Sequence, residues 1–175
     1  MIYLDYAATT PLDPAVLREV TRVNKQIFGN PASLHRYGQE ALAVVDGARE
    51  VIAKSIGAEF QEIMFAGSAT EANNLALRGV VRGLTQIKTQ INADIPHIIV
   101  TAIEHESVLE TARDMERTHE VRVTVIPVAS DGLVDINAIK KSLDDDTVLV
   151  SVMYVNNVVG TIQPISAIAD VIRNW

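Results

Sequence analysis

Apolar runs and helix-like repeats alternate along this chain from residue 62 onward. Four short apolar runs have the length and β-branched content of strands, at 62–66, 97–102, 121–127 and 147–153. Each is followed by a stretch that predicts a helix, at 70–84, 107–117, 135–143 and 165–175. Strands separated by helices form βαβ units, so the pattern predicts an α/β fold with a mostly parallel sheet and flanking helices.

The first 60 residues predict helices without a strand. Asp13 and Pro14 are typical of a helix N-cap and a first helical position, and this helix is expected to end near residue 28. A second helix is predicted over 36–56, with Gly57 as its C-terminal stop. In the turn-rich loop between them, we expect His35 to cap the helix or to hydrogen-bond within the loop.

Residues 62–74, EIMFAGSATEANN, have the features of an anion site. Small residues at 67–69 let the backbone turn sharply between the predicted strand and a helix that begins at Thr70. Ser68 and Glu71 stand at capping-box spacing. Free N–H groups and the positive end of the helix dipole favour a phosphate there. A βα turn without a ligand is the alternative that this pattern leaves open.

Polar residues also follow two other predicted strands, at the sheet edge where ligands of α/β proteins bind. His105, preceded by Glu104, follows the second strand. It can stack on a flat cofactor or relay a proton, or it can be a structural or surface residue at a helix start. Asn157 follows the fourth strand and can donate to a cofactor hydroxyl, or form a turn near Gly160.

The remaining polar positions are assigned structural roles. Ser107 and Glu110 predict a capping box at the start of the 107–117 helix, and Asp135 predicts an N-cap. His97 and His119 show no spacing with each other or with paired acids that suggests metal ligands. No metal site is predicted.

Composition narrows the function classes. The chain has 175 residues, 48% of them hydrophobic, which is enough for one sizeable core. A net charge of -7 argues against nucleic acid or an anionic membrane as the main partner. The apolar runs are far shorter than a membrane span, and the N-terminus has no basic n-region. With no cysteine, the chain has no disulfide and no thiol nucleophile. We expect a soluble cytoplasmic protein.

Five segments in register resemble the NifS/IscS-type cysteine desulfurases, which belong to the class V aminotransferase group of pyridoxal-phosphate enzymes with fold type I. The segments are LDYAATTPLDPAV (4–16), GNPASLHRYGQEA (29–41), IMFAGSATEANNLALRG (63–79), TAIEHESVL (101–109) and VNNVVGTIQPI (155–165). The resemblance implies an N-terminal strap with helices at 1–60 and an incomplete pyridoxal-phosphate-binding large domain at 61–175. It also implies pyridoxal 5'-phosphate as the cofactor.

The resemblance assigns roles to four residues. Ala69 and Thr70 would hold the cofactor phosphate, His105 would stack on the ring and take part in proton transfer, and Asn157 would contact the ring hydroxyl and the substrate region. The implied reaction converts L-cysteine to L-alanine and passes sulfur to a protein cysteine. In this family it serves iron–sulfur cluster or thio-cofactor assembly, in a homodimer that works with a scaffold or sulfur-acceptor protein.

Two alternatives accompany this interpretation. The chain could belong to another class V enzyme, a selenocysteine lyase or an aminotransferase; the five motifs favour the desulfurase, but the residues that would settle the choice lie in the second half of the family sequence. It could also be a catalytically inactive desulfurase-like remnant that acts as a binding partner.

The chain departs from the family pattern in its phosphate turn. The family usually reads F-T-S-G-A/G-T-E, whereas this chain has Gly67 one place earlier and Ser68 where glycine is usual. If that position required a positive φ, serine would cost about 1 kcal/mol. Val158 replaces a glutamate that is frequent in the family, which we take as minor.

The larger departure concerns the second half of the family sequence. The resemblance places three functional groups there: the Asp that pairs with the pyridine nitrogen, the Schiff-base Lys and the nucleophilic Cys. We therefore expect the N-terminal part of a longer protein, inactive by itself, from a truncated gene, a split gene or a deliberate cut. A separate C-terminal half is an expected partner. The resemblance also implies that the strand at 62–66 is separated from the other three.

Overall fold

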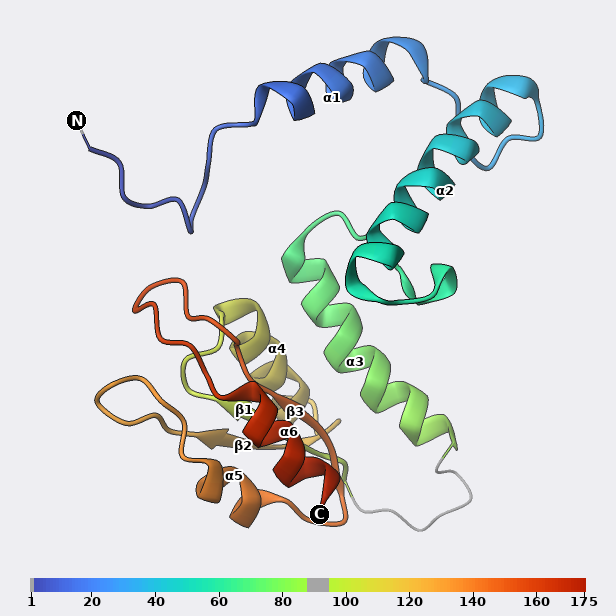
Figure 1. Cartoon of the computed structure of the whole chain (residues 1–175). Coiled ribbons are helices and arrows are strands. Elements are labelled where there is room, and N and C mark those ends of the chain that lie inside the picture. The colour runs from blue at the N-terminus through green and yellow to red at the C-terminus, as the bar shows by residue number, and fades with distance from the viewer. Residues whose placement is uncertain (1, 88–94) are drawn as a thin grey trace. The chain divides into compact units, whose positions relative to one another are not determined.

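The computed structural model describes residues 2–87 and 95–175. They form two compact units, Met1–Phe65 and Ala66–Trp175, each of which is described by itself below (Figure 1). Within the described residues, no helix is both long and apolar enough to cross a membrane. The predicted domain boundary at residue 60 stays a prediction, because compactness does not test which residues bind a cofactor.

The first unit consists of helices. They are α1 (Pro14–Gln26), α2 (Arg36–Ile56) and the short 3-10 helix η1 (Phe60–Glu62). The Asp13 carboxylate accepts the Ala15 N–H at 2.7 Å, which confirms the predicted N-cap of α1. Gly57 ends α2 in the left-handed conformation at φ 69°, as predicted. His35 caps α2, since its Nδ1 accepts the Gly38 N–H at 3.4 Å.

The predicted strand at 62–66 is wrong. Residues 63–66 form no strand, and the sheet has three strands that exclude them. A strand needs a neighbour for its N–H and C=O groups, and this segment has none among the described residues. Arg49 of α2 contacts this segment in place of a neighbouring strand. Its guanidinium donates to the Ile63 carbonyl and lies 4.8 Å from the centre of the Phe65 ring. The separation from the other strands agrees with what the resemblance implied.

The second unit holds the sheet and four helices. The strands are β1 (His97–Thr101), β2 (Arg122–Ile126) and β3 (Thr147–Ser151). The helices are α3 (Ala69–Ile87), α4 (Glu106–Arg117), α5 (Ile136–Ser142) and α6 (Ile165–Arg173). All strand pairs are parallel, in the order β2-β1-β3, and Ile98 faces Val123 on one side and Leu149 on the other. The predicted α/β fold with a parallel sheet is confirmed.

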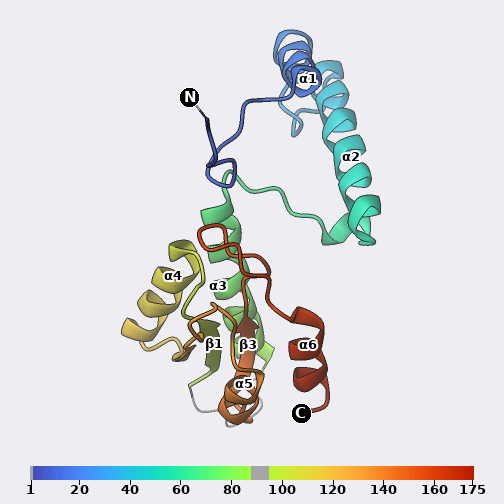
Figure 2. The ribbon, with the colours of Figure 1, turned by 60° about the vertical axis from the view of Figure 1, so that its left-hand side comes forward.

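Side chains on β1 alternate between two apolar layers. Ile98 and Val100 pack in the layer that holds α3 and α4, which includes Leu77 and Met115. Ile99 packs in the opposite layer, which holds α5 and α6 (Figure 2). Because helices cover both of its faces, β1 is completely buried, and this explains why its sequence is apolar without interruption.

The chain reverses direction across the sheet after β2. The connection from β1 through α4 leads to β2 on one side, whereas the connection through α5 leads back past β1 to β3. Helices α4 and α5 lie on opposite faces, as right-handed crossovers in opposite directions require. The carboxyl ends of β1 and β3 therefore flank a topological switch point, the usual ligand position in an open α/β sheet.

The buried carboxylate of Glu104 joins the two strand ends at this switch point. Its Oε1 accepts the Thr101 hydroxyl and the Met153 backbone N–H, both at 2.6 Å. Its Oε2 accepts the Ser151 hydroxyl at 3.1 Å. Two of these bonds tie the loop after β1 to the end of β3 and to the loop that follows it, and the third holds Glu104 to the end of its own strand.

His97 lies at the opposite end of the strands, as the first residue of β1. The side chain is 1% exposed, and its ring spans all three strands. Its Nδ1 lies 2.9 Å from Thr147 Oγ1, and its Nε2 lies 2.8 Å from Thr124 Oγ1. Burial lowers the pKa of His97, and the Arg122 charge lowers it further, while Asp144 opposes both. The side chain is neutral at pH 7 and serves as a structural bridge.

Asp144 stands beside His97. Burial would raise the pKa of Asp144, but hydrogen bonds from Arg122 and Thr147 outweigh that effect and bring its pKa to about 2. Its stabilising contribution is therefore complete above the ordinary pKa of 3.8 and is lost as the pH falls from there through the folded-state pKa of about 2.

We expect the Glu104→Leu variant to lose about 3 kcal/mol or more of unfolding free energy, because one buried and two partly buried donors lose their acceptor. Glu104→Gln keeps an acceptor oxygen and should cost about 1 kcal/mol. Urea unfolding followed by circular dichroism measures both. The control is Glu106→Leu, at an exposed acid two residues further on, with an expected loss below about 1 kcal/mol. Equal losses at both positions would contradict the bridging role of Glu104.

His97 should make stability fall as the pH drops from about 7.5 to about 5.5. The unfolded histidine takes up a proton near its ordinary value of about 6.5, whereas the folded one resists it, so the unfolded state binds more protons. In His97→Gln this part of the pH dependence should disappear. His119→Asn removes an exposed histidine and tolerates the positive φ of 59°, so it should leave the pH dependence unchanged. Urea midpoints across this pH range decide the matter.

Candidate functional site

Two side chains cap the N-terminus of helix α3. Ser68 Oγ accepts the Glu71 N–H at 3.1 Å, and Glu71 Oε2 accepts the Gly67 N–H at 2.7 Å. The predicted Ser68–Glu71 capping pair is confirmed, although Glu71 reaches Gly67 and not Ser68 itself. Neither Gly67 nor Ser68 has a positive φ. The serine that departs from the family pattern is therefore unstrained here, and it caps the helix.

The caps leave two amides available at the same helix end. Among the described residues, the N–H groups of Ala69 and Thr70 have no hydrogen-bond acceptor, and both residues are exposed. Free amides in the first turn of a long helix, beside a threonine hydroxyl, suit a phosphate group. The residues present thus fit the phosphate end of pyridoxal 5'-phosphate.

His105 is the N-cap of α4. Its Nδ1 accepts the Ser107 backbone N–H at 3.0 Å and lies 2.8 Å from Ser107 Oγ. The predicted capping box of Ser107 with Glu110 is therefore wrong, because Ser107 lies inside the first turn and Glu110 pairs with Arg113. The His105 imidazole therefore acts as the N-cap in place of the Ser107 side chain. His105 itself is exposed, and its Nε2 makes no hydrogen bond within the described residues.

The two asparagines after β3 have different roles. Asn156 is buried: its Oδ1 accepts the Val158 and Val159 N–H groups at 2.9 Å, and its Nδ2 donates to the Ile103 carbonyl at 3.0 Å. Asn157 is exposed in the turn that Asn156 stabilises, and its side chain makes no hydrogen bond within the described residues. Asn156 thus forms the turn, and Asn157 is free to meet a ligand.

Contacts between the segments hold the predicted site residues in one region. Asn73, one turn after Ala69, donates from Nδ2 to Ser107 Oγ at 2.8 Å, which joins the start of α3 to the start of α4. Asn156 and Glu104 join the loop after β3 to the loop that carries His105. No hydrogen bond within the described residues joins any two of the four predicted site residues directly.

Sequence reasoning missed the residues that connect this region. Glu104 was noted only as a neighbour of His105, and Asn73 and Asn156 carried no signal beyond their place in N-N pairs. Their partners lie 34 to 53 positions away in the chain, so only the fold brings them together. The one hint that the sequence offers is the position of the acid Glu104 directly after a predicted strand.

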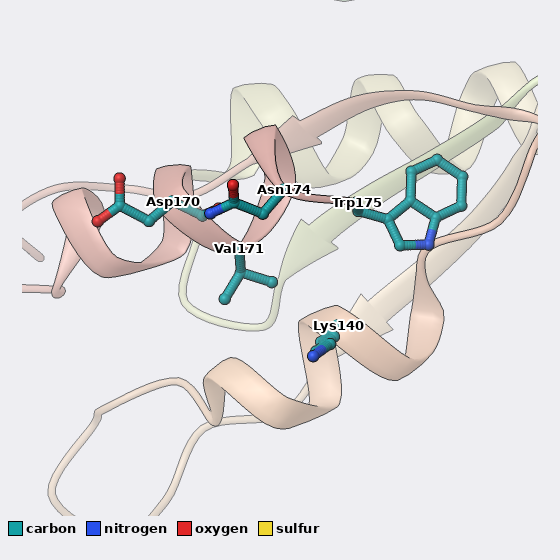
Figure 3. Close-up of a pocket in the computed structure, with 5 residues that line it drawn as sticks. All are labelled: Lys140, Asp170, Val171, Asn174 and Trp175. Carbon is teal, nitrogen blue, oxygen red and sulfur yellow. The ribbon is translucent and has the colours of Figure 1, made fainter.

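A pocket in the second unit lies away from these residues. It has a volume of about 330 Å³ and lies between α5 and α6 (Figure 3). Its lining consists of Lys140, Asp170, Val171, Asn174 and Trp175. None of the candidate residues lines it. Within residues 2–87 and 95–175, no three His, Asp or Glu side chains cluster in a way that could hold a metal ion.

Comparisons with known proteins agree with this geometry. The model of the family "Aminotransferase class-V" matches residues 2–175. The cysteine desulfurase IscS of Proteus mirabilis is 45% identical over 176 residues, covering 99% of this chain and 42% of the relative. Among solved structures, a NifS-like protein superimposes with a TM-score of 0.89 at 37% identity, covering 99% of this chain and 45% of that one.

A second solved structure, "SspA in complex with cysteine", has a TM-score of 0.87 and 33% identity over 98% of this chain and 47% of that one. The chain thus spans less than half the length of the relatives it matches. Since the family model covers nearly every residue, the chain belongs to the class-V aminotransferase family.

Proposed function

We propose that this chain is the N-terminal portion of a pyridoxal-phosphate-dependent cysteine desulfurase. The observation that carries the proposal is the pair of free amides at Ala69 and Thr70, tied through Asn73 and Ser107 to His105. The likeness to cysteine desulfurases over 99% of the chain supports the same reaction. The structure of SspA bound to cysteine supports L-cysteine as the substrate.

In this proposal, Ala69 and Thr70 bind the cofactor phosphate, His105 lies against the ring, and Asn157 meets the ring hydroxyl and the substrate. Bound pyridoxal 5'-phosphate supplies an electron sink that stabilises negative charge at the substrate Cα. His105 holds a proton at Nε2 beside that region. The Glu104 bridge keeps His105 and Asn157 on the same edge of the sheet.

The overall reaction breaks the C–S bond of L-cysteine, releases L-alanine and forms an S–S bond on an acceptor cysteine. This sequence contains no cysteine, so the acceptor thiol comes from outside these 175 residues. We propose that the chain works within a longer or two-part protein, as a cytoplasmic homodimer, and passes sulfur to a scaffold or acceptor protein. By itself the chain should be inactive.

The complete native protein, with any separate C-terminal half included, should form L-alanine and sulfide in equal amounts when it is supplied with pyridoxal 5'-phosphate, L-cysteine and a thiol reductant. Alanine formed from L-selenocysteine but not from L-cysteine would indicate a selenocysteine lyase. Transfer of the amino group to a 2-oxo acid would indicate an aminotransferase. If none of these products forms, whether or not the cofactor binds, the protein is an inactive binding partner.

Thr70→Val should weaken pyridoxal 5'-phosphate binding by about tenfold or more, because a hydroxyl donor to a charged phosphate is removed. Equilibrium dialysis measures the affinity, and inorganic phosphate should compete with the cofactor. The control is Thr21→Val, at an exposed helical threonine whose hydroxyl donates only to its own helix, to the Leu17 carbonyl at 2.8 Å. Unchanged affinity in Thr70→Val would remove Thr70 from the phosphate site.

A further inference from the structure

The backbone fixes which ring nitrogen of His105 accepts hydrogen bonds. The Ser107 N–H points at Nδ1 over 3.0 Å. A backbone amide can only donate, so Nδ1 must present its lone pair. The neutral ring therefore carries its proton on Nε2, an assignment that follows from the hydrogen-bond network.

A second donor reinforces this tautomer. Ser107 Oγ lies 2.8 Å from Nδ1, and the lone pair already required there makes the hydroxyl the donor. The oxygen of that hydroxyl in turn accepts from Asn73 Nδ2 at 2.8 Å. The order of donation is therefore Asn73 to Ser107 to His105, and successive hydrogen bonds of this kind strengthen one another.

The network lies beneath the candidate site. Ser107 is 9% exposed and Asn73 is half-buried, whereas His105 is exposed. Asn73 stands four positions after Ala69 and three after Thr70, hence its side chain lies on the same face of α3 as the side chains of these two residues. One asparagine thus links the helix end that offers phosphate donors to the serine that orients the histidine.

We infer that Asn73 and Ser107 are positioning residues that hold His105 in the Nε2–H tautomer and present that N–H to the site. The functional consequence rests on the proposed function, because only a bound cofactor and substrate would use the proton. The tautomer itself is a property of the protein without them.

Nitrogen-15 NMR of the histidine side chains tests the inference on the protein without cofactor. At about pH 8.5, above the ordinary titration range of histidine, His105 should show Nδ1 unprotonated and Nε2 protonated. Loss of its signals in His105→Gln identifies them among the four histidines. In Ser107→Ala the Nδ1–H form should rise about fivefold relative to the Nε2–H form, as expected for one hydrogen bond lost.

Two variants separate orientation from structure. Ser107→Thr keeps the hydroxyl and should restore the wild-type tautomer ratio. Asn73→Asp replaces the donor with an acceptor for the Ser107 hydroxyl, and should raise the Nδ1–H form as Ser107→Ala does. The control is Asn74→Ala, at the next asparagine, whose Nδ2 donates within its own helix to the Thr70 carbonyl at 3.0 Å. It should leave His105 unchanged.

A dominant Nδ1–H form in the wild-type protein, or a ratio unmoved in both Ser107→Ala and Asn73→Asp while circular dichroism shows them folded, would overturn the inference. The tautomer test and the desulfurase assay fail independently. The expected tautomers without any alanine formation would refute the proposed function only. Alanine formation with unmoved tautomers would refute the positioning role only.

Discussion

The carboxylate of Glu104 holds together the sheet edge on which the candidate site depends. It accepts one hydrogen bond from the last residue of β3, one from the loop that follows β3, and one from Thr101 at the end of β1. A buried charge of this kind is stable only when its acceptor capacity is used, and here three donors use it. The loops that carry His105 and Asn157 leave this point in different directions, so their geometry is set where the two strands end.

The reversal of chain direction explains why the site forms at this place. Because α4 follows β1 and α6 follows β3 on opposite faces of the sheet, the segments after β1 and β3 diverge and leave the sheet edge open between them. Helix α3 reaches the same region through Asn73 and packs over the sheet beside α4. Three segments far apart in sequence thus contribute a helix end, an imidazole and an amide to one chemical environment.

The opposite edge of the sheet is stabilised in a different way. His97 replaces the usual apolar residue with a ring that bridges a threonine on each neighbouring strand. It needs no charge for this role, and burial keeps it neutral. The two ends of β1 therefore each carry a polar side chain whose hydrogen-bonding groups are satisfied, on either side of an apolar centre.

The sequence by itself determined the α/β class, the parallel sheet and most helix boundaries, because hydrophobic period and caps such as Asp13, Gly57 and Ser68 are local. It also proposed Ala69 and Thr70 as candidates from a helix start, and His105 and Asn157 as candidates from the ends of predicted strands. It failed at 62–66, where an apolar run predicts a strand but only a neighbouring strand can make one. The tertiary structure alone decided the Glu104 bridge, the exchange of Ser107 for His105 as the cap of α4, and the contact of Asn73 with Ser107. Each depends on partners distant in sequence, whose proximity no local pattern encodes.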